Sequence, residues 1–139
     1  MYKEIINIQS GNIATYKRLK VTDDIIYFSH ANGFCGQVYK SLLNQIDKDY
    51  EVITYDMRGH GDTNLVADHS KLKSWYTFRD DLAHLIQDHK KPVTLSGHSM
   101  GGTASLLLAL SNPKLVKKLI LIDPVISVSY THLRAHETD

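Results

Sequence analysis

Residues 92–102 have the sequence PVTLSGHSMGG, and this stretch decides the fold of the chain. Its apolar start predicts a β-strand, and the run TASLLLAL at 103–110 predicts a helix directly after it. Gly97 and Gly101 stand two positions before and after Ser99, where they remove side chains that would clash in a sharp strand-to-helix turn. The pattern therefore predicts that Ser99 is held in a strained conformation with its hydroxyl exposed.

A serine in the pattern G-x-S-x-G, between a strand and a helix, is typical of a nucleophile elbow. The alternative is a glycine-rich turn that only tightens a strand-to-helix crossover. The flanking strand and helix favour the nucleophile, because a random five-residue match would lack that context. We therefore interpret Ser99 as the candidate catalytic residue, with Gly97 and Gly101 shaping its turn.

The composition indicates a single globular domain. With 139 residues, 42% of them hydrophobic, the chain can form one core and is too short for two. Its 16 basic and 15 acidic side chains give a formal net charge of +1, without a long run of either sign. We therefore expect no nucleic-acid partner, since that would need a basic stripe.

Neither a membrane anchor nor a disulfide is predicted. No apolar segment reaches the roughly 18 residues that a membrane-spanning helix needs, and the residues after Met1 lack the apolar stretch of a signal peptide. Cys35 is the single cysteine and cannot form an internal disulfide. We expect no membrane span and a cytoplasmic location.

Short β-rich runs alternate with amphipathic helical windows along the chain. This alternation predicts an α/β fold with a mostly parallel sheet and helices on both faces. The first two runs are separated by Ser10-Gly11 and are predicted to form a hairpin at the sheet edge. The predicted strands are 3–9, 12–19, 24–29, 51–55, the run that begins at Val93, and 118–123.

Three helical windows lie between these strands. The first, Gln37 to Ile46, has four apolar residues on one face: Val38, Leu42, Leu43 and Ile46. The second has Ser74 as its N-cap, and its apolar face is Trp75, Phe78, Leu82, Leu85 and Ile86. The third follows Ser99 and ends at Asn112-Pro113, because proline cannot continue the helix.

The last residues break this pattern, so we divide the chain into a core at 1–127 and a tail at 128–139. The tail has neither a helical period nor strand alternation. Its string SYTHLRAHET at 129–138 resembles a translated sequencing adapter of the kind found at the ends of metagenomic gene predictions. We therefore expect the tail to be foreign to the core and assign no function to it.

Four motifs in one order carry a resemblance to a known family. They are HANGF at 30–34, DMRGHGD at 56–62, the Ser99 elbow and LILIDP at 119–124. Together they resemble the N-terminal part of an α/β-hydrolase-fold enzyme, over about residues 25–125. The resemblance implies the strand order 1-2-4-3-5-6, with Ser99 at the carboxyl end of the fifth strand. The family's later strands and lid are absent, so the fold is expected to be incomplete, with an exposed edge strand.

The resemblance also implies where an oxyanion would be held. In this family, one backbone N–H follows the nucleophile and another comes from the loop after the third strand. At the matching positions of this sequence these are Met100 and Phe34. Losing one such donor costs on the order of 2.7–4 kcal/mol in the activation barrier.

Serine needs a base, and in this family the order along the chain is serine, acid, histidine. We leave the catalytic acid and histidine unassigned, because the strands that carry them in the family are not present. Asp123 is interpreted as a strand terminator, and His132 and His136 lie in the tail. The chain by itself is expected to be marginally stable and inactive.

The remaining conspicuous residues are interpreted as structural. The segment 58–61 is predicted to shape a turn through arginine and aspartate side chains, and His98 to support the elbow. His30 is predicted to be satisfied by nearby backbone, and Cys35 to line the pocket. The eight histidines show no ligand spacing, so we predict no metal and no cofactor.

The resemblance implies a serine hydrolase that acts on a carboxylic ester, thioester, lactone or similar small-molecule acyl substrate through an acyl-serine intermediate. A serine at the elbow disfavours the relatives that use aspartate there. Two alternatives stay open: a non-catalytic ligand-binding protein of the same fold, and an acyltransferase or perhydrolase that uses the same serine. The identity of the substrate and the oligomeric state are not predicted.

Overall fold

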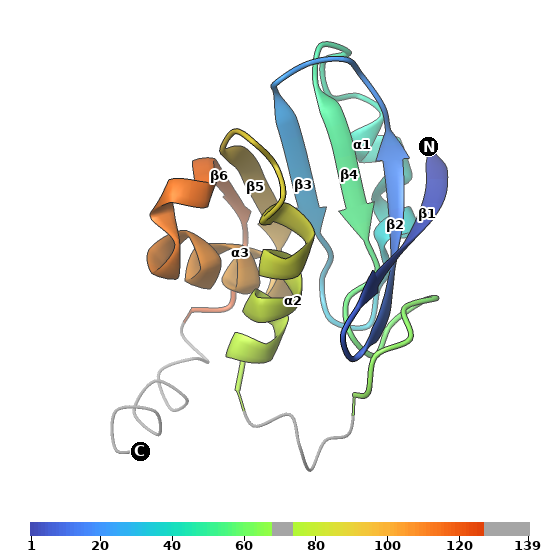
Figure 1. Cartoon of the computed structure of the whole chain (residues 1–139), viewed down its shortest axis with the longest axis vertical. Coiled ribbons are helices and arrows are strands. Elements are labelled where there is room, and N and C mark those ends of the chain that lie inside the picture. The colour runs from blue at the N-terminus through green and yellow to red at the C-terminus, as the bar shows by residue number, and fades with distance from the viewer. Residues whose placement is uncertain (68–73, 127–139) are drawn as a thin grey trace.

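Six strands form one mixed sheet in the order β1-β2-β4-β3-β5-β6, as expected from the family resemblance (Figure 1). The computed structural model describes residues 1–67 and 74–126, so the tail at 128–139, with His132 and His136, lies outside the described residues. The strands are β1 (Tyr2–Ile8), β2 (Gly11–Arg18), β3 (Ile25–Ser29), β4 (Glu51–Tyr55), β5 (Val93–His98) and β6 (Val116–Ile122).

The sheet combines an antiparallel edge with a parallel centre. β1 and β2 form the predicted hairpin around Ser10-Gly11, and β2 pairs antiparallel with β4. β3 pairs in parallel with both β4 and β5, and β5 in parallel with β6. Parallel strands point their carboxyl ends to the same edge, so the segments that follow β3, β4 and β5 meet there.

Helices cover both faces, as predicted. Neighbouring strand residues point to opposite faces, and Tyr27 and Ile53 belong to one apolar cluster, whereas Phe28 and Val52 belong to another. The first cluster packs under α2 (Tyr76–Ile86) and α3 (Met100–Ser111), which lie side by side in Figure 1. The second packs under the short pieces η1 (Gly36–Tyr39) and α1 (Lys40–Leu43).

The first helical window was predicted too long. A 3₁₀ turn, η1, and a single α turn, α1, replace the expected helix at 37–46. Of the predicted apolar face, Leu43 is buried, but Val38 and Leu42 are 59% and 50% exposed. A 3₁₀ turn has 3.0 residues per turn instead of 3.6, so the change at Tyr39 rotates the two pieces relative to each other.

The start of α2 and the end of α3 lie close to where the sequence predicted them. The Ser74 hydroxyl accepts the Tyr76 N–H at 3.0 Å, but α2 begins at Tyr76 and its N-cap position is Trp75, one residue later than the predicted Ser74. α3 ends at Ser111, just before Asn112-Pro113. No helix within 1–67 and 74–126 is long and apolar enough to cross a bilayer.

Strand β6 forms the second edge of the sheet. It pairs only with β5 in the described part of the chain. Leu119 packs against the cluster under α3, whereas Ile120 and Ile122, on the other face of the strand, are 44% and 42% exposed. The predicted open edge is therefore present in this structure.

Candidate active site

The elbow places Ser99 between β5 and α3 in a left-handed backbone conformation, with φ 52° and ψ −116°. Non-glycine residues adopt this region at a cost of about 1–3 kcal/mol, so the neighbouring structure must enforce it. The Ser99 N–H donates to the Ile122 carbonyl at 3.0 Å, and the Ser99 carbonyl accepts the Thr103 N–H at 3.0 Å. These two bonds tie the residue to β6 and to the first turn of α3.

Close backbone packing explains the two elbow glycines. A Cβ atom on Gly97 would overlap the backbone of Gly101 and Gly102. A Cβ atom on Gly101 would overlap the carbonyl groups of Ser29 and His30. No side chain fits at either position without moving the backbone, so both glycines shape the turn sterically.

Met100 is the first residue of α3, and its N–H lies next to Ser99 in the chain. The first amides of a helix have no partner inside the helix and carry partial positive charge from its dipole. The Met100 N–H has no acceptor among the described residues. It is available to a negatively charged oxygen.

Phe34 lies in a turn at residues 31–34, and its N–H is already used there. This N–H donates to the Ala31 carbonyl at 3.1 Å, and Gly33 has φ +82°, as in a type II turn. Asn32 and Cys35, in the same loop, have amides without an acceptor in the described part of the chain. The oxyanion role predicted for the Phe34 N–H thus competes with its bond to Ala31, and Asn32 has an unbonded amide two residues earlier.

His30 begins this loop and is fully buried. Its Nδ1 donates to the Ala31 carbonyl at 2.7 Å, and its Nε2 accepts the Met57 N–H at 2.8 Å. Burial lowers the pKa of His30 to about 4, so the ring is neutral. The structure confirms that this histidine is satisfied by nearby backbone.

Two side chains also hold the turn: Tyr39, which the sequence did not single out, and His60, from the segment 58–61 that was predicted to shape a turn. The Tyr39 hydroxyl accepts the Ala31 N–H at 3.1 Å and lies 2.8 Å from Nδ1 of His98. His60 Nε2 accepts the Gly33 N–H at 2.9 Å. The hydrogen bond to Tyr39 confirms the supporting role predicted for His98. No local pattern marked Tyr39, because it fell inside the expected helix at 37–46.

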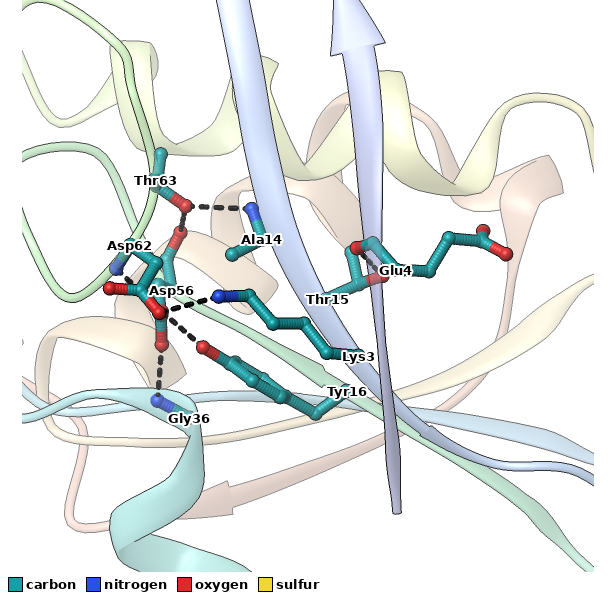
Figure 2. A network of polar contacts seen from close by, with 9 residues as sticks. All are labelled: Lys3, Glu4, Ala14, Thr15, Tyr16, Gly36, Asp56, Asp62 and Thr63. Atoms are coloured by element: carbon teal, nitrogen blue, oxygen red, sulfur yellow. Dashed lines mark hydrogen bonds and ion pairs between the residues drawn. The ribbon is translucent and has the colours of Figure 1, made fainter.

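The buried Asp56 carboxylate joins three segments of the chain (Figure 2). It accepts the Tyr16 hydroxyl at 2.8 Å and the N–H groups of Gly36 and Asp62, both at 2.9 Å. Burial, with help from Asp56, holds the pKa of Tyr16 far above its usual value, so the phenol remains a donor. The network anchors the start of η1, directly after the loop that contains Phe34.

Arg58 ties the next loop to α2. Its Nε and Nη2 donate to the two carboxylate oxygens of Asp81 at 3.0 and 2.9 Å, and its Nη1 donates to the Val66 carbonyl. Both side chains of the ion pair are largely buried. The structural interpretation of the segment 58–61 is confirmed, with Asp56 and Asp81 as the aspartates.

The structure identifies no base for Ser99, because its hydroxyl has no hydrogen-bond partner among the described residues. Asp123 follows the last residue of β6, is exposed, and makes no side-chain hydrogen bond within the described residues. Cys35 is free and half-buried, and the described residues contain no cluster of three or more metal-ligating side chains.

Comparison with known proteins gives a consistent family assignment. The family model described as serine aminopeptidase, S33, matches residues 22–137. The chain is 36% identical over 100 residues to the sn-1-specific diacylglycerol lipase ABHD11 of Danio rerio, which covers 71% of this chain and 30% of that protein. It is also 45% identical over 74 residues to ethanol acetyltransferase 1 of Eremothecium cymbalariae, and this match covers 52% of this chain and 19% of that protein.

Solved structures share the fold. The thioesterase domain from the curacin biosynthetic pathway superposes with a TM-score of 0.82 at 22% identity, over 99% of this chain and 52% of that domain. The chain thus spans about half of this domain and a third or less of the two curated relatives.

Proposed function

The chain belongs to the serine aminopeptidase S33 family of α/β-hydrolases, and from this premise we propose that it carries the nucleophile of a serine hydrolase. The observation that carries the proposal is the conformation of Ser99, held at φ 52° between a strand and a helix. Its hydroxyl has no partner among the described residues, and the free Met100 N–H follows directly.

The reaction is acyl transfer in two steps. The Ser99 oxygen attacks the substrate carbonyl, its proton passes to a base, and the tetrahedral oxyanion collapses as the leaving group departs with a proton. Water then attacks the acyl-serine, which releases the carboxylic acid and restores the hydroxyl. Carboxylic esters are the favoured substrates, since one relative is a lipase; thioesters, lactones and similar acyl compounds share the chemistry.

The oxyanion would be held by two backbone amides. Met100 supplies one, because its N–H is free at the first turn of α3. The second would come from the turn at 31–34: Phe34 would have to give up or share its bond to Ala31, whereas the Asn32 amide makes no bond in the described part of the chain. We therefore propose Asn32 as the second donor, with Phe34 as the alternative.

The base and its acid are proposed to come from outside the described residues. In the family, both follow the nucleophile along the chain. A serine without a base reacts slowly at neutral pH, so this chain by itself is expected to acylate far more slowly than a form that includes the acid and the histidine.

The test is labelling with a fluorophosphonate probe, which reacts with activated serines. This chain, and any longer form that contains it, would be compared with their Ser99→Ala variants, with Ser111→Ala, at the exposed end of α3, as the control. We expect labelling that is lost only in Ser99→Ala. If neither form is labelled, the enzymatic proposal is wrong and the non-catalytic binding protein is favoured.

An acyltransferase is the second candidate, and its support is the 45% identity to an ethanol acetyltransferase. It uses the same acyl-serine but passes the acyl group to an alcohol instead of water. Product analysis in water and ethanol mixtures decides between the two. A hydrolase forms mainly the carboxylic acid. A transferase forms the ethyl ester, and the share of ester among the products exceeds the mole fraction of ethanol in the solvent.

A further inference from the structure

The turn at 31–34 is held from outside by two side chains. The Ala31 N–H donates to the Tyr39 hydroxyl, and the Gly33 N–H donates to His60 Nε2. The free amide of Asn32 lies between these two bonded amides in the chain. Its direction is therefore fixed by the peptide units on either side, each anchored to a ring.

Tyr39 is the more informative of the two because its hydroxyl also reaches the elbow. A hydroxyl can accept and donate at once. It accepts from Ala31, so its own hydrogen is available to Nδ1 of His98, 2.8 Å away. His98 immediately precedes Ser99, and one oxygen atom therefore connects the 31–34 turn to the nucleophile turn.

The Tyr39 ring has a separate, structural role. It lies 4.5 Å from the ring of Phe28, 6.1 Å from that of Phe34 and 5.9 Å from that of His98, measured between centroids. It also packs against the apolar cluster on the η1 face of the sheet. Replacing tyrosine by phenylalanine keeps this packing and removes only the bridge.

We propose that Tyr39 is a positioning residue whose hydroxyl sets the separation between the two halves of the oxyanion site, the 31–34 turn and the Ser99 elbow. The proposal rests on the proposed function for its catalytic consequence, whereas the bridge itself is a property of the fold. Misplacement of a catalytic group by about 1 Å can cost on the order of a hundredfold in rate.

The experiment compares Tyr39→Phe with Tyr50→Phe in the longest form of the protein that labels. Tyr50 is the matched control: it packs against the same apolar cluster, and its hydroxyl bonds to nothing in the described part of the chain. We expect Tyr39→Phe to slow fluorophosphonate acylation roughly tenfold to hundredfold, with little change in the affinity for the unreacted probe. Tyr50→Phe should react at the wild-type rate.

Two further readouts do not depend on activity. Hydrogen exchange at the Ala31 amide should accelerate in Tyr39→Phe, and the ¹⁵N shift of His98 Nδ1 should move, with both unchanged in Tyr50→Phe. If Ser99 is never labelled but these signals move, the proposed function fails and the bridge stands. If Tyr39→Phe leaves the Ala31 exchange or the acylation rate at wild-type values, the positioning role is overturned.

A double-mutant cycle with His98→Phe tests whether the effect passes through the bridge. His98→Phe keeps a ring but removes the nitrogen that Tyr39 contacts. Residues that act through one contact are non-additive. The double variant should therefore acylate no more slowly than the slower single variant, and additive losses would contradict a shared bridge.

Discussion

Two turns meet around Ser99, and they are stabilised in different ways. The elbow is held by steric exclusion, since backbone atoms of Ser29, His30 and Gly102 fill the space that side chains at Gly97 and Gly101 would need. The 31–34 turn is held by hydrogen bonds to rings, and a Cβ atom on its glycine, Gly33, would meet nothing within 4 Å.

The difference explains which turn a sequence reveals. The steric constraint on the elbow is local, because its two glycines lie within one stretch of five residues. They are therefore recognisable as a sequence motif. The partners of the 31–34 turn lie 8 and 27 residues from the amides that they bind, and the bridge from Tyr39 to His98 spans 59 residues. A hydrogen-bond partner at such a distance leaves no local pattern.

The largest effect should come from adding a methyl group to the elbow. Gly101→Ala would force a Cβ atom into the carbonyl groups of Ser29 and His30, and backbone cannot move aside as a flexible side chain can. Overpacking of this kind costs about 3 kcal/mol or more. Urea unfolding should show that loss, together with loss of any Ser99 labelling.

Gly102→Ala is the matched control one residue away. Its Cβ atom would lie 3.2 Å from the Gly97 carbonyl oxygen and 3.3 Å from the Pro124 Cβ, which small shifts can relieve. Alanine also favours the helix by up to about 1 kcal/mol. We expect a free energy of unfolding within about 1 kcal/mol of wild type. Equal losses in both variants would contradict a steric origin for the elbow.

Much of the fold follows from pattern alone. The hairpin, the strand at Glu51–Tyr55 and the end of α3 before Pro113 were all predicted from apolar runs and turn residues. The strand order came from the family resemblance. The prediction of one helix at 37–46 was wrong. Its apolar residues fit one helical face, but the chain there forms two short pieces, η1 and α1.

The parts of the site whose shape depends on neighbouring residues in the sequence were predicted better than the parts that depend on distant contacts. Ser99, Gly97 and Met100 occupy the positions that the motif gives them. Phe34 could be placed in the loop from the sequence. The bond from its amide to Ala31 depends on the type II turn, which the motif HANGF at 30–34 does not specify. Their catalytic roles stay predictions.

A second effect should come from acidification, mainly through the buried His30 at the start of the 31–34 loop. The pKa of His30 is about 4 in the folded protein, against 6.5 when exposed, because burial opposes its charge. Between these values the unfolded chain binds more protons, so stability falls as the pH is lowered. From pH 7 to pH 5 the loss from His30 should be about 2 kcal/mol, and it should level off below pH 4.

The measurement is the free energy of unfolding at pH 7 and pH 5, by urea titration. His30→Gln should reduce the difference between the two values by about 2 kcal/mol, whatever its own stability. His84→Gln, at an exposed position of α2, is the matched histidine-to-glutamine control. His89, whose pKa burial also lowers, adds a smaller contribution of the same sign in every variant. An unchanged difference in His30→Gln would show that His30 is not held neutral by the fold.

The smallest effect should come from Gly33, where the constraint is conformational only. A methyl group there has free space, but φ +82° lies in the left-handed region that L-residues enter at a cost of about 1–2 kcal/mol. Gly33→Ala should therefore lower the free energy of unfolding by about 1 kcal/mol, and Gly33→Asn by less, because asparagine tolerates this region better. Urea unfolding measures both. If Gly33→Ala cost as much as Gly101→Ala, the 31–34 turn would be held by packing like the elbow, and the contrast between the two turns would be lost.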